Sequence, residues 1–209
     1  SIRSKKIVVA TNGFYQEGLI PQMDGRVLPV ISNIIVTRKL NEEEINIHNF
    51  KTFSPIANTK NLLYYYRKLP DNRILFGTRG DLTGSNQSNL DMSKKMEKFL
   101  KDIFPAWSNV TIDYNWRGLI ALSQKLTPSI GKIEGEEIYY GFGYNGVGVS
   151  AAPWAGKQLS KLVFSSNSKE LDISKIYKGL PEKFIFPQLR TFYFRLAVWF
   201  YAIKDKLNI

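Results

Sequence analysis

The sequence predicts an α+β fold built on a mostly antiparallel mixed sheet with packed helices. Three observations lead to this prediction. Several short stretches alternate apolar and polar residues, residues 89–104 switch to a helical apolar period, and two more helical stretches close the chain. The strands do not alternate regularly with helices, as they would in a parallel α/β sheet.

The first part of the chain predicts strands. In "KKIVVATNGF" a continuous apolar run, residues 7–10, precedes a glycine turn, which is typical of a strand buried on both faces. Residues 26–40 are rich in β-branched side chains and predict a strand interrupted near Pro29. Residues 61–81 predict a hairpin that turns at "PDN".

The later part predicts three helices and further strands. The first helix, residues 89–104, ends at Pro105, and its apolar face would hold Met92, Met96, Phe99, Leu100 and Ile103. The next stretch alternates again, and one face of a strand would hold Val110, Ile112, Tyr114 and Trp116. A second helix begins near Ser150, a polar connection covers residues 165–182, and the last helix begins near Pro187.

The composition excludes several kinds of chemistry. Cysteine is absent, which excludes disulfides, thiolate metal sites and cysteine nucleophiles, and His48 is the only histidine, which excludes His-rich metal sites and most catalytic triads. We therefore expect no metal. The net charge of +11 favours an anionic partner, but the lysines are dispersed. That dispersal indicates a solvated basic surface and no nucleic-acid partner.

No stretch reaches the ~20 apolar residues that a membrane span needs. The most apolar one, residues 191–203, contains Arg195 and predicts a packed or interfacial helix. We expect a cytoplasmic protein.

The stretch "GFGYNGVGVS" contains the pattern G-x-G-x-x-G at Gly141, Gly143 and Gly146. A dinucleotide fingerprint would need a further strand ending in an acidic residue ~20 residues on, and "KLVFSSNSKE" does not supply one. The sequence therefore predicts no complete Rossmann unit. The glycines still allow the backbone to approach a flat or anionic group, at which the helix from Ser150 would point its free N–H groups. A tight strand-to-helix connection without a ligand is the equally open alternative.

Five stretches occur in the order of one known family: "IVVATNGF", "RVLPVISNIIVTRKL", "YYYRKLPDNRILFGTRGD", "WRGLIALSQKLTPSIGKI" and "GFGYNGVGVSAAPWAGKQL". They resemble the C-terminal half of the FAD-dependent amine and D-amino-acid oxidoreductases, the superfamily of glycine oxidase, sarcosine oxidase and D-amino-acid dehydrogenase. The gamma-glutamylputrescine oxidoreductase-like branch is the most similar in character, and the resemblance covers nearly the whole chain. It implies oxidation of an amine or amino-acid C–N bond by hydride transfer to the flavin.

The resemblance also implies a division of the chain. Residues 1–25 would be a remnant strand of the FAD-binding domain, and residues 26–127 the substrate-binding sheet with its helix. Residues 128–165 would hold the flavin-facing strands, glycine loop and helix, and residues 166–209 the closing loop and helix.

The residues that the resemblance implies in the site fall into two groups, and none of them is a catalytic acid or base. Those beside FAD are Thr11, Asn12, Gly13, Gly131, Gly143, Tyr144, Asn145, Gly146, Val147 and Gly148. Those on the substrate side are Tyr66, Arg79 and Trp116, with Arg79 for a substrate carboxylate and ordinary sheet packing as the alternative for each. Gly148 stands where sarcosine oxidases carry a lysine, so a sarcosine-like binding mode is not expected.

The family's N-terminal FAD cradle has no counterpart before Ser1. We therefore expect a fragment that binds FAD weakly or not at all and is inactive alone. An exposed apolar surface beside "KIVVATNG" would favour self-association or a missing N-terminal half. Two alternatives stay open. One is a stand-alone basic α+β module for an anionic ligand or nucleic acid, and the other is a last helix at a membrane surface through Phe192, Tyr193, Trp199 and Phe200.

Overall fold

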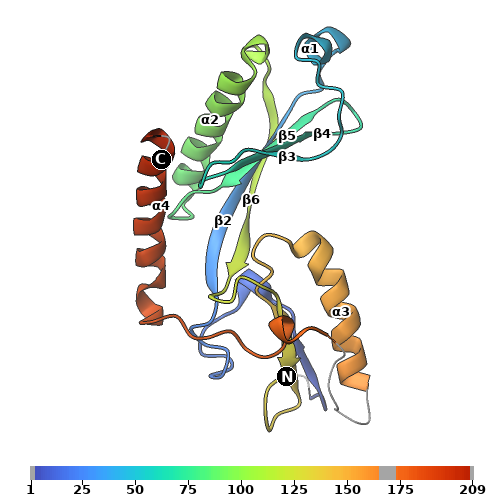
Figure 1. Ribbon diagram of the computed structural model, residues 1–209, viewed down its shortest axis with the longest axis vertical. Coiled ribbons are helices and arrows are strands. Elements are labelled where there is room, and N and C mark those ends of the chain that lie inside the picture. Colours follow the sequence, from blue (N-terminus) through green and yellow to red (C-terminus); the bar gives the residue numbers. More distant parts are fainter. Residues whose placement is uncertain (1–2, 165–172, 208–209) are drawn as a thin grey trace. The chain divides into compact units, whose positions relative to one another are not determined.

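The computed structural model describes residues 3–164 and 173–207 (Figure 1). Its internal contacts divide the chain into two compact units. The first unit comprises Ser1–Val30 and Leu119–Tyr193, and the second comprises Ile31–Gly118 and Phe194–Ile209. The segments expected at 1–25 and 128–165 therefore fall together in the first unit. Both units combine strands with helices, which confirms the α+β prediction.

The second unit is built on a sheet with the strand order β3-β4-β5-β2-β6. The pairs β3–β4, β4–β5 and β2–β5 are antiparallel. The predicted hairpin is confirmed, and Asn72 in its turn takes the left-handed conformation (φ 65°). The five strands are β2 (Leu28–Thr37), β3 (Ile56–Ala57), β4 (Tyr64–Lys68), β5 (Ile74–Arg79) and β6 (Ile112–Leu122).

Helix α2 (Asn86–Ile103) lies along this sheet and confirms the predicted helix (Figure 1). The Ser85 side chain accepts a hydrogen bond from the Ser88 backbone N–H and so caps the helix start. Met96 and Leu100 are about one helical turn apart, so both side chains lie on the same face of α2. This face is buried against the sheet. The core between helix and sheet is Ile35, Leu40, Ile45, Phe50, Ile74, Phe76, Met96, Leu100, Phe104, Trp107 and Val110.

A short helix, α1 (Glu42–Ile47), was not predicted. Its start is a capping box, in which Asn41 and Glu44 each bond the other's backbone N–H. The turn of residues Pro105–Trp107 (η2) packs against it, and the Trp107 indole N–H donates to the Glu44 carbonyl at 2.7 Å.

The first unit contains a three-stranded sheet in the order β1-β8-β7. Strand β1 (Ile7–Val9) runs parallel to β8 (Ile138–Phe142), and β7 (Ser129–Lys132) runs antiparallel to β8. Helix α3 (Gly148–Phe164) follows β8 after the glycine turn, close to the predicted start near Ser150. Its Ala155 and Leu159 pack with Ile130 and Tyr139. The other sheet face packs against a second cluster that includes Val9, Ile20, Met23, Tyr140 and Phe142.

Three sequence predictions about the strands are wrong in detail. The strand predicted at residues 7–10 is not buried on both faces, since Ile7 and Val8 are 50% and 48% exposed. Strand β1 is an edge strand that pairs with β8 alone. Ile7 and Val8 are thus partly exposed apolar side chains within "KIVVATNG", beside which an apolar surface is expected. Pro29 does not interrupt β2, because it precedes Ser32–Val36, the residues that pair with β5. Val110 does not belong to the predicted strand face, because β6 begins only at Ile112. Tyr114 and Trp116 of β6 are 56% and 44% exposed.

The remaining turns are η1 (Asn12–Phe14), η3 (Lys175–Tyr177) and η4 (Pro187–Leu189). The last helix, α4 (Arg190–Leu207), follows η4, as predicted from Pro187. Part of the polar connection predicted at residues 165–182 lies outside the described residues. Within the described ranges, no helix has both the length and the apolar character to cross a membrane.

Candidate functional site

Two turns meet at the carboxyl ends of the parallel strands β1 and β8. The first holds Thr11, Asn12 and Gly13, and the second begins at Gly143. They are joined because the Asn12 side-chain oxygen accepts a hydrogen bond from the Gly143 N–H at 3.1 Å. Asn12 takes the left-handed conformation (φ 49°), which asparagine tolerates better than most residues. Open sheets bind ligands at the carboxyl ends of parallel strands, so this junction is the candidate site.

The second turn is the glycine loop, residues 143–148, and Asn145 fixes its shape. The Asn145 backbone N–H donates to the Ala121 carbonyl, and its side-chain oxygen accepts from the Ser123 N–H, both at 3.0 Å. Its side-chain amide donates to the Gly143 carbonyl. Gly143, Asn145 and Gly146 all have positive φ, at 73°, 50° and 97°. The loop is therefore held in one conformation before any ligand binds.

Gly146 presents open backbone. A Cβ atom added there would meet no atom within 4 Å. Among the residues that the structure describes, no group accepts a hydrogen bond from the Gly146 N–H. Helix α3 begins two residues later, and its first turn adds free N–H groups and the positive end of the helix dipole. Val147 and Val149 are 55% and 97% exposed. The loop thus offers donors and open backbone to a flat, electron-rich group.

Tyr144 anchors the loop through the packing of its ring. Its ring packs with the cluster that includes Tyr139, Ala155 and Leu159. Burial raises the pKa of the Tyr144 phenol, so the group is neutral at ordinary pH. Gly148 is the first residue of α3, and a Cβ added there would make an ordinary contact of 3.6 Å with Tyr144 Cβ.

Gly13 and Gly131 lie where neighbouring segments pack closely. A Cβ at Gly13 would lie 3.0 Å from Leu119 Cβ, and one at Gly131 would lie 2.4 Å from the Tyr140 hydroxyl oxygen. Both glycines therefore let neighbouring segments approach.

The structure places the three predicted substrate residues in different surroundings. Tyr66 packs against Phe76 and Phe104 in the core beneath α2. Arg79 lines a cavity of about 310 Å³ in the second unit, and Trp116 is 44% exposed on the edge strand β6. No hydrogen bond, ion pair or ring contact joins the three within the described part of the chain.

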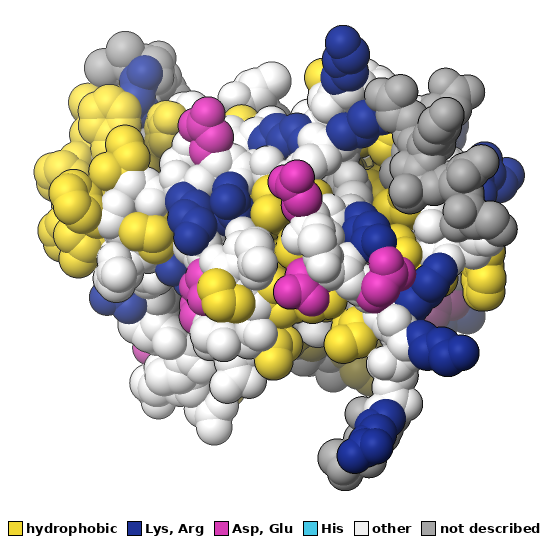
Figure 2. Space-filling view, turned by 90° about the horizontal axis from the view of Figure 1, so that it is seen from below, with side chains coloured by type: hydrophobic (Ala, Val, Ile, Leu, Met, Phe, Trp, Pro, Cys, Tyr) yellow, Lys and Arg dark blue, Asp and Glu magenta, His cyan; other side chains and the backbone are white. Residues whose placement is uncertain are grey.

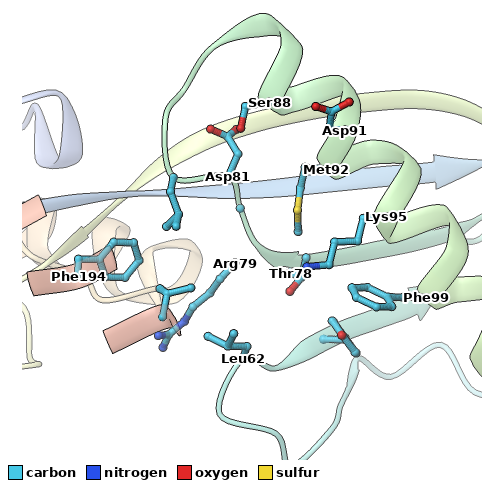
Figure 3. A pocket seen from close by; sticks show the side chains of 14 residues that line it. Leu62, Thr78, Arg79, Asp81, Ser88, Asp91, Met92, Lys95, Phe99 and Phe194 are labelled. Carbon is cyan, nitrogen blue, oxygen red and sulfur yellow. The ribbon is translucent and has the colours of Figure 1, made fainter. Parts of the chain in front are cut away.

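The cavity that Arg79 lines is shown in Figure 3. Arg79 extends from the end of β5 and Lys95 from α2, with Phe99 and Phe194 on the apolar walls. Asp81 also lines it, but this carboxylate accepts from the backbone N–H groups of Thr83 and Gly84. No carboxylate pairs with Arg79 or Lys95 among the residues described.

Sequence reasoning missed Tyr65, which lies on the opposite sheet face from Tyr66. Its ring lies over Gly77, where an added Cβ would be 2.2 Å from Tyr65 Cζ. The Tyr65 hydroxyl is 3.0 Å from the Ser32 hydroxyl. Two features of the sequence could have indicated this contact. Successive residues of "YYY" point to opposite faces of a strand, and the other strand of the predicted hairpin contains a glycine.

Curated relatives match the chain over nearly its whole length. Gamma-glutamylputrescine oxidoreductase of Escherichia coli is 28% identical over 211 residues, which cover 100% of this chain and 47% of that protein. Probable oxidoreductase OrdL of Haemophilus influenzae is 29% identical, covering 99% of this chain and 46% of that protein. The chain thus spans about half the length of the curated relatives it matches.

Solved structures share the fold. Glycine oxidase from Bacillus cereus has a TM-score of 0.62 at 18% identity, covering 80% of this chain and 44% of that one. Iminodiacetate oxidase from Chelativorans has a TM-score of 0.61 at 19% identity, covering 87% and 48%. The family described as FAD dependent oxidoreductase matches residues 1–162. Because that match takes in more than half of the chain, the chain belongs to the FAD dependent oxidoreductase family.

Proposed function

We propose that this chain supplies the flavin edge and the substrate sheet of an FAD-dependent oxidoreductase that acts on an amine or an amino acid. Family membership and the relatives' names support the class of reaction. The observation that carries the proposal is the glycine loop, joined to the β1 turn through Asn12 and Gly143. The glycine loop lies at the position in the sequence that the resemblance assigns to the contact with the flavin.

The loop fits a flavin ring by its chemistry. The ring is flat, and its reduced form carries negative charge near N1 and the C2 carbonyl. Gly146 gives open backbone with a free N–H, and the first turn of α3 adds donors and a positive dipole end. Asn12, Gly146 and the start of α3 would hold this edge, while Tyr144 and Asn145 keep the loop in shape.

When bound, FAD would supply the acceptor for a hydride equivalent from the carbon beside the amine nitrogen of the substrate. The chain's own residues then need only position the reactants and exclude water. Arg79 is the group we propose for a substrate carboxylate, because no acidic side chain among the described residues neutralises it. Tyr66 and Trp116 stay proposals for the pocket wall.

The test is a titration of the 209-residue chain with FAD, followed by flavin fluorescence and extended to high FAD concentrations because weak binding is expected of this chain alone. Gly146→Ala should weaken FAD binding by about tenfold or more, because a methyl group then stands on the open backbone. Gly135→Ala is the matched control. Gly135 also has a positive φ (76°), and a Cβ added there would likewise meet no atom within 4 Å, but it lies in the turn between β7 and β8.

The control separates binding from backbone strain. Both substitutions place alanine in a left-handed conformation and should cost similar unfolding free energy, on the order of 1 kcal/mol. Equal loss of FAD affinity in both variants would overturn the assignment of the loop. Binding of a simple polyanion without any binding of FAD would favour the alternative of a basic ligand-binding module.

A further inference from the structure

Helix α4 is attached to the second unit along one side. The Asp205 carboxylate accepts hydrogen bonds from the backbone N–H groups of Asn61 and Leu62, at 2.9 and 2.8 Å, and from the Asn61 side-chain amide. Phe194 and Val198 line the cavity of Figure 3. These three α4 residues recur at the helical period, so they define a single inner face.

The opposite face of α4 is apolar and uncovered. Its residues are Leu196, Trp199, Phe200, Ile203 and Leu207, which are 50%, 66%, 54%, 38% and 60% exposed. They are spaced at i, i+3, i+4, i+7 and i+11, so they lie on one side of the helix, turned away from the inner face. We call them the outer face. Figure 2 shows hydrophobic side chains gathered at its left edge, the side on which α4 lies in Figure 1.

Basic residues lie on both margins of the outer face. By helical geometry Lys206 falls on one margin and Lys204 on the other. The Lys204 amino group lies 5.8 Å from the centre of the Phe200 ring. The one acidic residue of α4 is Asp205, and it is held on the inner face by Asn61 and Leu62. The outer face is therefore apolar at its centre and purely cationic at its edges.

We propose that the outer face of α4 binds an anionic lipid surface. An aromatic and aliphatic face with basic margins is the arrangement that lies in the headgroup region of a bilayer. The rings of Trp199 and Phe200 would enter the boundary between headgroups and acyl chains, and Lys204 and Lys206 would meet lipid phosphates. The net charge of +11 adds long-range attraction to the same surface.

Charge also distinguishes this partner from a second copy of the chain. If two α4 helices paired through their outer faces, the lysine margins would meet with no carboxylate between them, because Asp205 is turned inward. Like charges would then face each other. An anionic bilayer neutralises both margins at once.

The experiment is flotation of the 209-residue chain with vesicles of phosphatidylcholine alone, or of phosphatidylcholine with phosphatidylserine. We expect binding to the anionic vesicles and weakening by added salt. The double variant Lys204→Glu/Lys206→Glu should weaken binding on the order of 30-fold or more. The control Lys39→Glu/Lys94→Glu makes the same change in net charge at positions outside α4 and should keep most of the binding.

A second measurement locates the contact. Brominated lipids quench a tryptophan that enters the bilayer, and Trp199 and Trp116 are both exposed. Trp199→Phe should abolish the quenching, and Trp116→Phe should leave it unchanged. Circular dichroism on every variant shows that the fold is kept.

Three outcomes would overturn the proposal. The first is no binding of the folded wild-type chain to anionic vesicles. The second is equal loss of binding in the α4 and control variants. The third is a dimer in solution that Trp199→Ser dissociates, without vesicle binding, which would make a second copy the occupant of the outer face.

Discussion

The Asn12 side-chain oxygen and the Gly143 backbone N–H, 131 positions apart in the sequence, form a hydrogen bond of 3.1 Å. This bond joins the turn after β1 to the glycine loop after β8. Both turns leave the carboxyl ends of neighbouring parallel strands, so one bond fixes the two backbones that would face the flavin.

Replacing Asn12 should therefore loosen the loop. Asn12→Ala leaves the Gly143 N–H without its acceptor and places alanine at a φ of 49°, so we expect a loss of about 1–3 kcal/mol in unfolding free energy. Asn12→Asp keeps the acceptor oxygen and should retain most of the stability. Urea denaturation measures both. Equal stability of wild type and Asn12→Ala would show that the bond does not hold the loop.

Gly77 should tolerate no side chain while Tyr65 lies over it. Gly77→Ala puts a methyl group 2.2 Å from Tyr65 Cζ, so the ring must move, at an expected cost of about 1–3 kcal/mol. Gly118→Ala, in β6, is the control, because a Cβ there meets nothing within 4 Å. In a double-mutant cycle, Tyr65→Ala should remove much of the penalty of Gly77→Ala. Strictly additive effects would contradict the close approach.

The Arg38–Glu44 ion pair should make stability depend on pH in the acid range. The hydrogen bond from Arg38 lowers the pKa of Glu44 from its ordinary value of 4.5 to about 2. A lowered folded-state pKa contributes stability that is present above the unfolded value, and that contribution is lost as the pH falls through 4.5 toward about 2. The pair is partly exposed to solvent, so we expect a contribution of ~1 kcal/mol at most.

The check is urea denaturation between neutral pH and about pH 3. Glu44→Gln should reduce the slope of stability against pH in this window, whereas Glu43→Gln, an exposed neighbour on α1, should leave it unchanged. The same slope in Glu44→Gln and wild type would contradict the role of the pair.

Asp205 should anchor the end of α4. Asp205→Ala removes the acceptor of three hydrogen bonds from Asn61 and Leu62, so the last turns of α4 should open more often. Hydrogen exchange should accelerate about tenfold or more in the last turns of α4 and remain unchanged in β5. Asp102→Ala is the control, because Asp102 is exposed and, among the residues the structure describes, pairs with Lys98 alone. Unchanged exchange in Asp205→Ala would mean that Asp205 does not anchor the end of α4.

Local patterns predicted most of the elements. The turn "PDN" located the β4–β5 hairpin, and the helical period located α2 because Met96 and Leu100 must share one face. The capping box at Asn41 and Glu44 could also have been recognised in the sequence, but α1 is too short to show a helical period of apolar residues.

The sequence did not predict which distant segments pair or pack together. The parallel pairing of β1 with β8 joins residues 7–9 to 138–140, and no local pattern specifies such a partner. Alternation shows that Tyr65 and Tyr66 point to opposite faces, but only the position of α2 shows which face is the core. The substrate residues followed from resemblance alone, and the structure distributes them over a core, a cavity and an edge strand.

The most direct test of the central claim is amide hydrogen exchange of the chain with and without a large excess of FAD, which compensates for the weak binding expected of this chain alone. If the glycine loop faces the flavin, FAD should slow exchange at Gly146 and in the first turn of α3 and leave the β4–β5 hairpin unchanged. Binding of FAD that protects other segments, with the exchange at Gly146 unaltered, would contradict the account.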